Sequence, residues 1–191
     1  STVTEIHGCA FYYLNITDIK LNEGLKIIGE QAFGGCTQLE RITLPESLES
    51  LGDGVFDCCK KLKSINIPEK LTVLPDALFN ACDFESFEIP AHIEKVGSRV
   101  FSLNPNFKEI TVAEGNLNYC AENGLLMNKE KTEIVFTAPA HLQGKCEVPD
   151  SVKKINEYAY KRRGIWMTRR IFALVLGIAL VMAFNQKPLL L

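Results

Sequence analysis

One pattern of residues recurs along this chain, and it restricts the fold more than any other feature. Residues 28–50 and 51–73 are both 23 residues long and match position by position. Each segment opens with an apolar residue and glycine, places Phe sixth, Cys ninth and Leu twelfth, and continues with Ile-x-Leu-Pro or Ile-x-Ile-Pro. Segments that repeat at such a period stack into solenoids, because one unit cannot bury its apolar side alone.

The pattern continues, with losses, on both sides of these two units. A third unit, 74–95, keeps the Phe and the Cys but is one residue shorter, and a fourth begins at Val96. Upstream, residues 19–25 match only the back half of a unit, and the front half before them does not match. Downstream, residues 148–160 restart the pattern after an interruption. The sequence therefore predicts a short stack of similar coils.

Within one unit, the residue pattern predicts two short strands and a turn. Residues 39–44 alternate as a half-buried strand does, and the proline that follows ends the strand. Residues 48–51 indicate a brief second strand on the return, and residues 30–36 predict a short helical turn with its apolar residues on one side. About five strands, spaced by roughly 4.8 Å, would form a short parallel sheet.

The consensus I-G-x-x-A-F-x-x-C-x-x-L-x-x-I-x-L-P resembles the BspA-like leucine-rich repeats of bacterial surface proteins. The resemblance covers residues 16–160 and includes the interruption at 113–147, where residues 116–132 are similar to a hairpin insertion of that family. It implies an α/β leucine-rich-repeat solenoid with short helical turns. We therefore expect a solenoid over residues 1–160, with the hairpin inserted at 113–147, and a separate tail over 161–191.

The polar residues between the buried strand positions form the candidate partner-binding face. Alternate side chains of a strand point to opposite sides, so stacking sets these residues side by side as a polar ladder. On solenoids such a face commonly binds a protein or a polymer, although a plain solvated face is also possible and no aromatic stripe marks this one. The face comprises Asp18 and Lys20, Arg41 and Thr43, Ser64 and Asn66, Ser86 and Glu88, and Glu109 and Thr111.

The spacing of the repeat cysteines indicates a packing role in the core rather than a metal or redox site. Cys36, Cys59 and Cys82 recur 23 residues apart, whereas zinc sites use closely spaced Cys pairs. We interpret them as compact apolar residues that recur once per coil. Cys120 and Cys146 flank the hairpin segment and can pair in an oxidising compartment.

No enzymatic, cofactor or nucleic-acid signature is present in the sequence. The chain lacks the common nucleophile, zinc-protease, phosphate-loop and dinucleotide motifs, so we predict no enzyme, no cofactor and no metal site. The net charge of −2 conceals a division: residues 161–191 hold six Lys or Arg and no acid, and residues 1–160 carry −8. An acidic solenoid is a poor candidate for binding nucleic acid.

The tail does not follow the repeat. Residues 171–184 are 14 consecutive residues without a polar side chain, preceded by two arginines. As an apolar helix this segment would span roughly 21 Å, against a hydrocarbon core of about 30 Å. Three interpretations stay open: a helix that caps the solenoid, a segment that contacts the membrane, or a segment foreign to the repeat protein. Exchange of the tail between two chains would produce a homodimer.

The sequence thus predicts a non-enzymatic extracellular or cell-surface repeat module. It would mediate adhesion by binding a protein or glycan through the polar face, and the family resemblance implies bacteria. The alternative is a structural spacer of a larger envelope protein, held at the membrane by the apolar tail segment.

Overall fold

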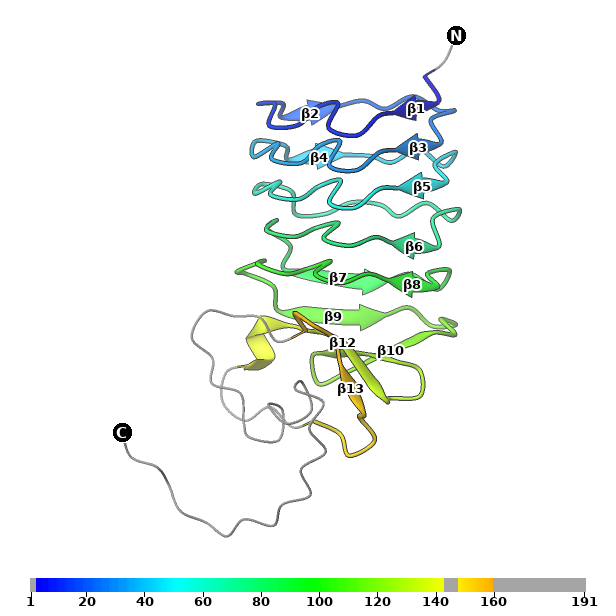
Figure 1. Cartoon of the computed structure of the whole chain (residues 1–191), viewed down its shortest axis with the longest axis vertical. Helices are drawn as coiled ribbons and strands as arrows, with labels where there is room; N and C mark the ends of the chain where they lie inside the picture. Colours follow the sequence, from blue (N-terminus) through cyan, green and yellow to red (C-terminus); the bar gives the residue numbers. More distant parts are fainter. Residues whose placement is uncertain (1–2, 143–147, 160–191) are drawn as a thin grey trace, which may run out of the picture.

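The protein is described from a computed structural model, which covers residues 3–142 and 148–159 (Figure 1). About six stacked turns form a β-solenoid whose strands run parallel from coil to coil (Figure 1). The elements are β1 (Glu5–Ile6), β2 (Asp18–Ile19), β3 (Ile27–Ile28), β4 (Arg41–Ile42), β5 (Ser50–Leu51), β6 (Val73–Leu74), β7 (Ser86–Ile89), β8 (Lys95–Val96), β9 (Glu109–Val112), β10 (Tyr119–Glu122), β11 (Leu125–Asn128), β12 (Glu133–Thr137), the 3₁₀ turn η1 (Pro139–Leu142) and β13 (Lys154–Ile155).

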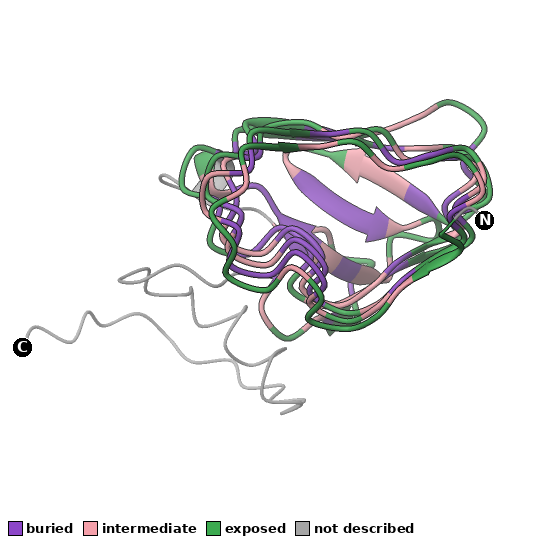
Figure 2. Cartoon of the chain, turned by 90° about the horizontal axis from the view of Figure 1, so that it is seen from above, coloured by how far each residue is buried: buried purple, intermediate pink, exposed green. Residues whose placement is uncertain are grey.

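The coil strands form two columns. One column holds the parallel sheet β1-β3-β5 and the parallel pair β6-β8, and the other holds the parallel pairs β2-β4 and β7-β9. The register places equivalent repeat positions opposite each other, as in Ile28↔Leu51 and Phe87↔Ile110. Viewed along the stack, the coils superimpose, and buried residues recur at the same places around the coil (Figure 2).

The predicted helical turns are wrong, because the described part of the chain contains no α-helix. At residues 30–36 the backbone instead forms consecutive turns. The N–H groups of Gln31 and Phe33 donate to carbonyls of the next coil, at 2.9 and 3.0 Å, while that of Gly34 donates within its own coil. Gln31 and Gly35 have φ of 51° and 72°, which a right-handed helix excludes. Bonding between coils thus replaces bonding within a helix.

Phenylalanine rings stack along the axis and form the centre of the core. Successive ring centroids are 5.0 Å apart for Phe11 and Phe33, 5.7 Å for Phe33 and Phe56, and 6.0 Å for Phe56 and Phe79. The rings of Phe33, Phe56 and Phe79 are fully buried. Phe101 continues the column, 5.9 Å from Phe79. The repeated Phe of the sequence therefore packs on its own equivalents in neighbouring coils.

The cysteine column packs as the sequence predicts. Cys36, Cys59 and Cys82 are buried, and the thiol of each donates to the carbonyl of a Phe one coil earlier, at 3.0–3.2 Å. Burial raises the pKa of the Cys59 and Cys82 thiols far above their usual range. A free thiol that is held neutral and packed among apolar side chains is inert.

The first coil is more complete than the sequence pattern indicates. Phe11 stacks on Phe33, and β1 pairs with β3 in the register Ile6↔Ile28, so the unmatched front half is a structural unit. Its glycine position holds His7. In the later coils that glycine lies against the preceding coil: a Cβ on Gly52 would lie 2.3 Å from the Glu30 nitrogen. In the described residues no coil lies on that side of His7, so the constraint is absent there.

An antiparallel unit follows the last coil. β10, β11 and β12 are joined in the order β10-β11-β12, and β13 pairs with β12 in parallel, in the register Ile134↔Ile155. Part of this end has a small core of its own: Leu125, Met127, Ile134, Val152, Ile155 and Ala159. The expected tail helix over residues 161–191 and the Cys120–Cys146 pair fall on residues 160–191 and Cys146, which lie outside the described residues. No helix in the described ranges is long and apolar enough to span a membrane.

Candidate binding face

The candidate face is the outer side of one strand column. Its ten residues lie on β2, β4, β7 and β9 or directly beside them, and on residues 64–66, and all ten are exposed. Parallel register places Asp18 opposite Arg41, and Ser86 opposite Glu109. The structure therefore brings the predicted ladder residues onto neighbouring strands.

The ladder is interrupted in its middle. The sequence predicts one continuous parallel sheet. Residues 61–67 form no strand, however, so β4 and β7 are not joined. The Leu44 N–H donates to Asn66 Oδ1 at 2.8 Å, and Asn66 Nδ2 donates to the Leu44 carbonyl at 2.8 Å. Because the Asn66 side chain occupies both polar groups of Leu44, it takes the place of a backbone ladder partner. Asn66 is thus a structural residue of the face.

The other face side chains have no hydrogen-bond or ion-pair partner within residues 3–142 and 148–159. Arg41 is exposed and faces no carboxylate within ion-pair distance in that part of the chain, although Asp18 is its register neighbour. Exposed polar groups of this kind are bonded to water and are available to a ligand. These residues are the predicted ladder without Asn66: Asp18, Lys20, Arg41, Thr43, Ser64, Ser86, Glu88, Glu109 and Thr111.

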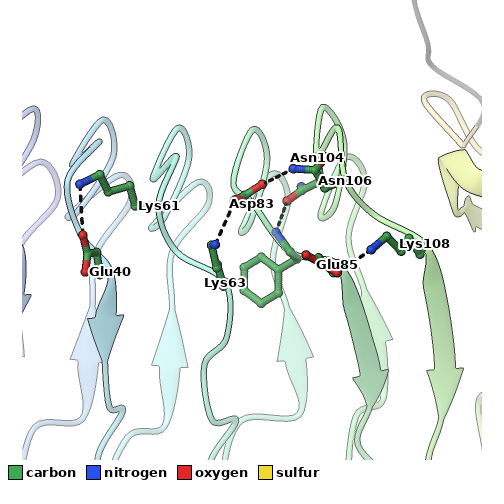
Figure 3. Close-up of polar contacts among 9 residues, drawn as sticks. Glu40, Lys61, Lys63, Asp83, Glu85, Asn104, Asn106 and Lys108 are labelled. Carbon is green, nitrogen blue, oxygen red and sulfur yellow. Dashed lines mark hydrogen bonds and ion pairs between the residues drawn. The ribbon is translucent and has the colours of Figure 1, made fainter.

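The charges at the edge of the face behave differently, because they pair between coils (Figure 3). Lys61 and Glu40 lie 3.1 Å apart, and Lys63 and Asp83 lie 3.7 Å apart. Asn106 also donates to Asp83, at 2.8 Å. In each of these pairs the cation and the carboxylate belong to successive coils, so the pairs join one coil to the next.

A third pair at the same edge is closer. Lys108 Nζ lies 2.7 Å from Glu85 Oε2, and this hydrogen bond lowers the pKa of the Glu85 carboxyl. Glu40, Lys63, Glu85 and Lys108 each directly precede a ladder position. Sequence reasoning identified the ladder but missed this edge row. The alternating signs at one repeat position were the signal that could have revealed it.

Two neighbouring hollows on the face share ladder residues. One, of about 450 Å³, is lined by Arg41, Thr43, Ser64 and Asn66 with two apolar neighbours. The next, of about 580 Å³, shares Arg41 and Ser64 with it and adds charged edge residues. The hollows are open and combine polar with apolar lining groups, which suits a ligand that lies along the surface.

Within the described residues, no group of three or more His, Cys, Asp or Glu side chains is arranged to hold a metal ion. Asn104 is a further residue that sequence reasoning missed. It occupies the cysteine position of the fourth unit, is buried, and its Nδ2 donates to the Phe79 carbonyl at 2.8 Å. It therefore makes the bond that the thiols make in other coils.

The coil geometry, with its Phe and Cys columns, defines a leucine-rich-repeat solenoid. A family model of the BspA type leucine rich repeat region matches residues 4–129 in six copies. The chain belongs to this family. The search of curated proteins found no match.

Several solved structures share the fold. The pneumococcal vaccine antigen PcpA is 26% identical with a TM-score of 0.73, and the match covers 82% of this chain and 40% of PcpA. A leucine rich cell surface protein from Faecalibacterium prausnitzii is 23% identical with a TM-score of 0.64, covering 83% and 49%. A leucine-rich repeat protein from Bacteroides ovatus is 32% identical with a TM-score of 0.54, covering 56% and 28%. The chain thus spans less than half the length of each.

Proposed function

We propose that this chain is a non-enzymatic binding module of a bacterial cell-surface protein, and that it mediates adhesion by holding a protein or glycan ligand on the ladder face. The observation that carries the proposal is that polar side chains at the edge and on the face differ in whether they are paired. Those at the edge bond to neighbouring coils, whereas those on the face, apart from Asn66, have no partner in the described residues.

The composition of the face supports a polar ligand. Arg41 offers a planar cation that matches carboxylate or sulfate groups, and Thr43 and Ser64 offer hydroxyls beside it. The large apolar side chains that are exposed lie elsewhere, for example Tyr13 and Leu117. Recognition through hydrogen bonds and charge fits this surface better than recognition through buried aromatic anchors.

The similar structures support the location. One of them is named as a cell surface protein and another as a vaccine antigen, and family membership joins this chain to such repeat proteins. A secreted or surface-exposed repeat module is the role that this chain shares most readily with them.

The test is binding of the full chain to arrays of glycans and of purified surface and matrix proteins. The variant Arg41→Ala/Ser64→Ala removes two partnerless groups from the face. The matched control Lys95→Ala/Ser50→Ala removes one cation and one hydroxyl from exposed positions of the other strand column. For the ligand found, we expect the face variant to weaken binding by at least about tenfold, which is 1.4 kcal/mol, and the control to bind as the wild type does.

Equal binding by both variants would refute the ladder face as the binding surface. Arrays without any ligand would favour the alternative function, a spacer in a larger envelope protein. In that case, deletion of residues 171–184 should release the protein from the membrane fraction.

A further inference from the structure

A cavity lies away from the centre of the ladder, between the last coil and the antiparallel end. It has a volume of about 700 Å³ and is lined by all of β9, by the turn at residues 113–115 and by β10. In Figure 1, β10 lies beside β9 at an angle to it. No backbone pairing joins β9 to β10 in the described chain. The cavity thus separates two sheet edges.

The outer edge of β9 presents free backbone groups to this cavity. The N–H groups of Glu109 and Ala113 donate to carbonyls of the preceding coil, at 3.3 and 2.9 Å. Since the direction of peptide groups alternates along a strand, those of Ile110 and Val112 point the other way. Both residues line the cavity, and neither has a further partner among the described residues.

The opposite wall is the outer edge of β10. β10 pairs only with β11, in the register Cys120↔Met127, and the Lys129 N–H donates to the Asn118 carbonyl. By the same alternation, the peptide group of Ala121 points away from β11. Ala121 lines the cavity as well. An extended chain placed here can therefore find backbone donors and acceptors on either side.

The cavity wall is acidic. Glu109 and Glu114 have no cationic partner in the described part of the chain. Glu122 is paired with Lys131 at 2.6 Å, and the only lysine of the lining, Lys129, donates to the Asn116 carbonyl at 2.9 Å. The remaining negative charge favours a ligand with cationic side chains.

We propose that this cavity is a docking groove for an extended, basic peptide segment of a partner protein, which adds as a strand to the edge of β9. Main-chain hydrogen bonds supply affinity in strand addition, and alternate side chains supply specificity. Lysine or arginine side chains on the ligand would lie toward Glu109 and Glu114. Glu109 and Thr111 belong to both surfaces, but the groove does not include Arg41 or Ser64 of the ladder face.

The first experiment compares three labelled peptides by fluorescence anisotropy with the full chain. One alternates lysine and valine, the second has glutamate in place of lysine, and the third keeps the lysines but carries N-methyl groups on alternate peptide nitrogens. We expect the first peptide to bind, the glutamate peptide not to bind, and the N-methyl peptide to bind at least about fivefold more weakly than the first, as loss of a hydrogen bond implies. Equal binding of the N-methyl peptide would overturn strand addition.

The second experiment places the peptide on the protein. Ala121→Pro removes one outward N–H without touching the β10–β11 ladder, and proline is tolerated at such edge positions. Glu114→Gln removes one charge of the wall. Each should weaken the lysine–valine peptide severalfold while thermal unfolding stays unchanged. The control Glu46→Gln removes one exposed carboxylate outside both the cavity and the ladder face, and should bind as the wild type does.

Three results would overturn the proposal. They are no binding of the lysine–valine peptide, equal weakening by the Glu46→Gln control, and a stable dimer in sedimentation to which the peptide does not bind. The last result would assign the groove to a second copy of this chain. Retained peptide binding in the variant Arg41→Ala/Ser64→Ala separates this groove from the proposed ligand face.

Discussion

The coils and the antiparallel end bury their apolar residues in different ways. In the coils, each core residue packs on its own equivalent one coil away, as Phe33, Phe56 and Phe79 do. In the end unit, Met127 and Ile134 pack with Val152 and Ile155 in a cluster separate from the core of the coils, which Phe136 joins instead. Stability in the coils is therefore shared along the stack, whereas at the end part of it depends on a small local cluster.

The largest loss of stability is expected where the column of stacked Phe rings is interrupted. Phe56→Ala removes a fully buried ring that lies between two others, so it should lower the free energy of unfolding by about 3–5 kcal/mol. Urea unfolding followed by circular dichroism measures it, with the exposed Leu103→Ala as control. A loss below about 1 kcal/mol would mean that the repeat register is wrong.

A substitution in the local cluster of the antiparallel end is the counterpart of Phe56→Ala. Met127→Ala should cost about 2–5 kcal/mol, the usual range for a buried methionine. Hydrogen exchange should show the largest loss of protection in β11–β13, because the Met127 side chain belongs to the local cluster there and not to the core of the coils. An equal loss across β3–β9 would show that the two regions unfold as one unit.

A smaller loss of stability is expected at Asn104, which stands where the earlier coils have cysteine. Asn104→Ala leaves the buried Phe84 N–H and Phe79 carbonyl without this partner, which should cost about 1–3 kcal/mol. Asn104→Cys should recover part of the loss, since Cys82 makes the equivalent bond in its own coil. Equal unfolding midpoints for the two variants would contradict the equivalence.

The smallest effect is a dependence on alkaline pH. Burial raises the pKa of Cys59 and Cys82 above the ordinary value of 9.0, so the folded state keeps protons that the unfolded state releases. Their contribution is complete below that ordinary value and is lost as the pH rises above it. The variant Cys59→Ala/Cys82→Ala should lose less stability between neutral and alkaline pH in urea unfolding. A slope identical to that of the wild type would exclude these thiols as the cause.

The difference between the periodic coils and the antiparallel end explains what the sequence could predict. Phe33 and Cys36 recur because every coil imposes the same packing, so periodicity alone located the core and the exposed ladder. The helical turn at 30–36 was mispredicted because its N–H groups bond to another coil, which local pattern cannot reveal. Asn66 was placed on the face correctly, but its bonds to Leu44 depend on how two coils meet. Nothing periodic marks the groove between β9 and β10, and the sequence did not indicate it.

The central claim is that the face side chains serve binding and the edge and core side chains serve the fold. Its most direct test measures unfolding and ligand binding together for Arg41→Ala/Ser64→Ala. We predict that this variant keeps the free energy of unfolding of the wild type and loses at least about tenfold in affinity for the ligand found on the arrays. An unchanged affinity, or a loss of stability comparable to that of Asn104→Ala, would contradict it.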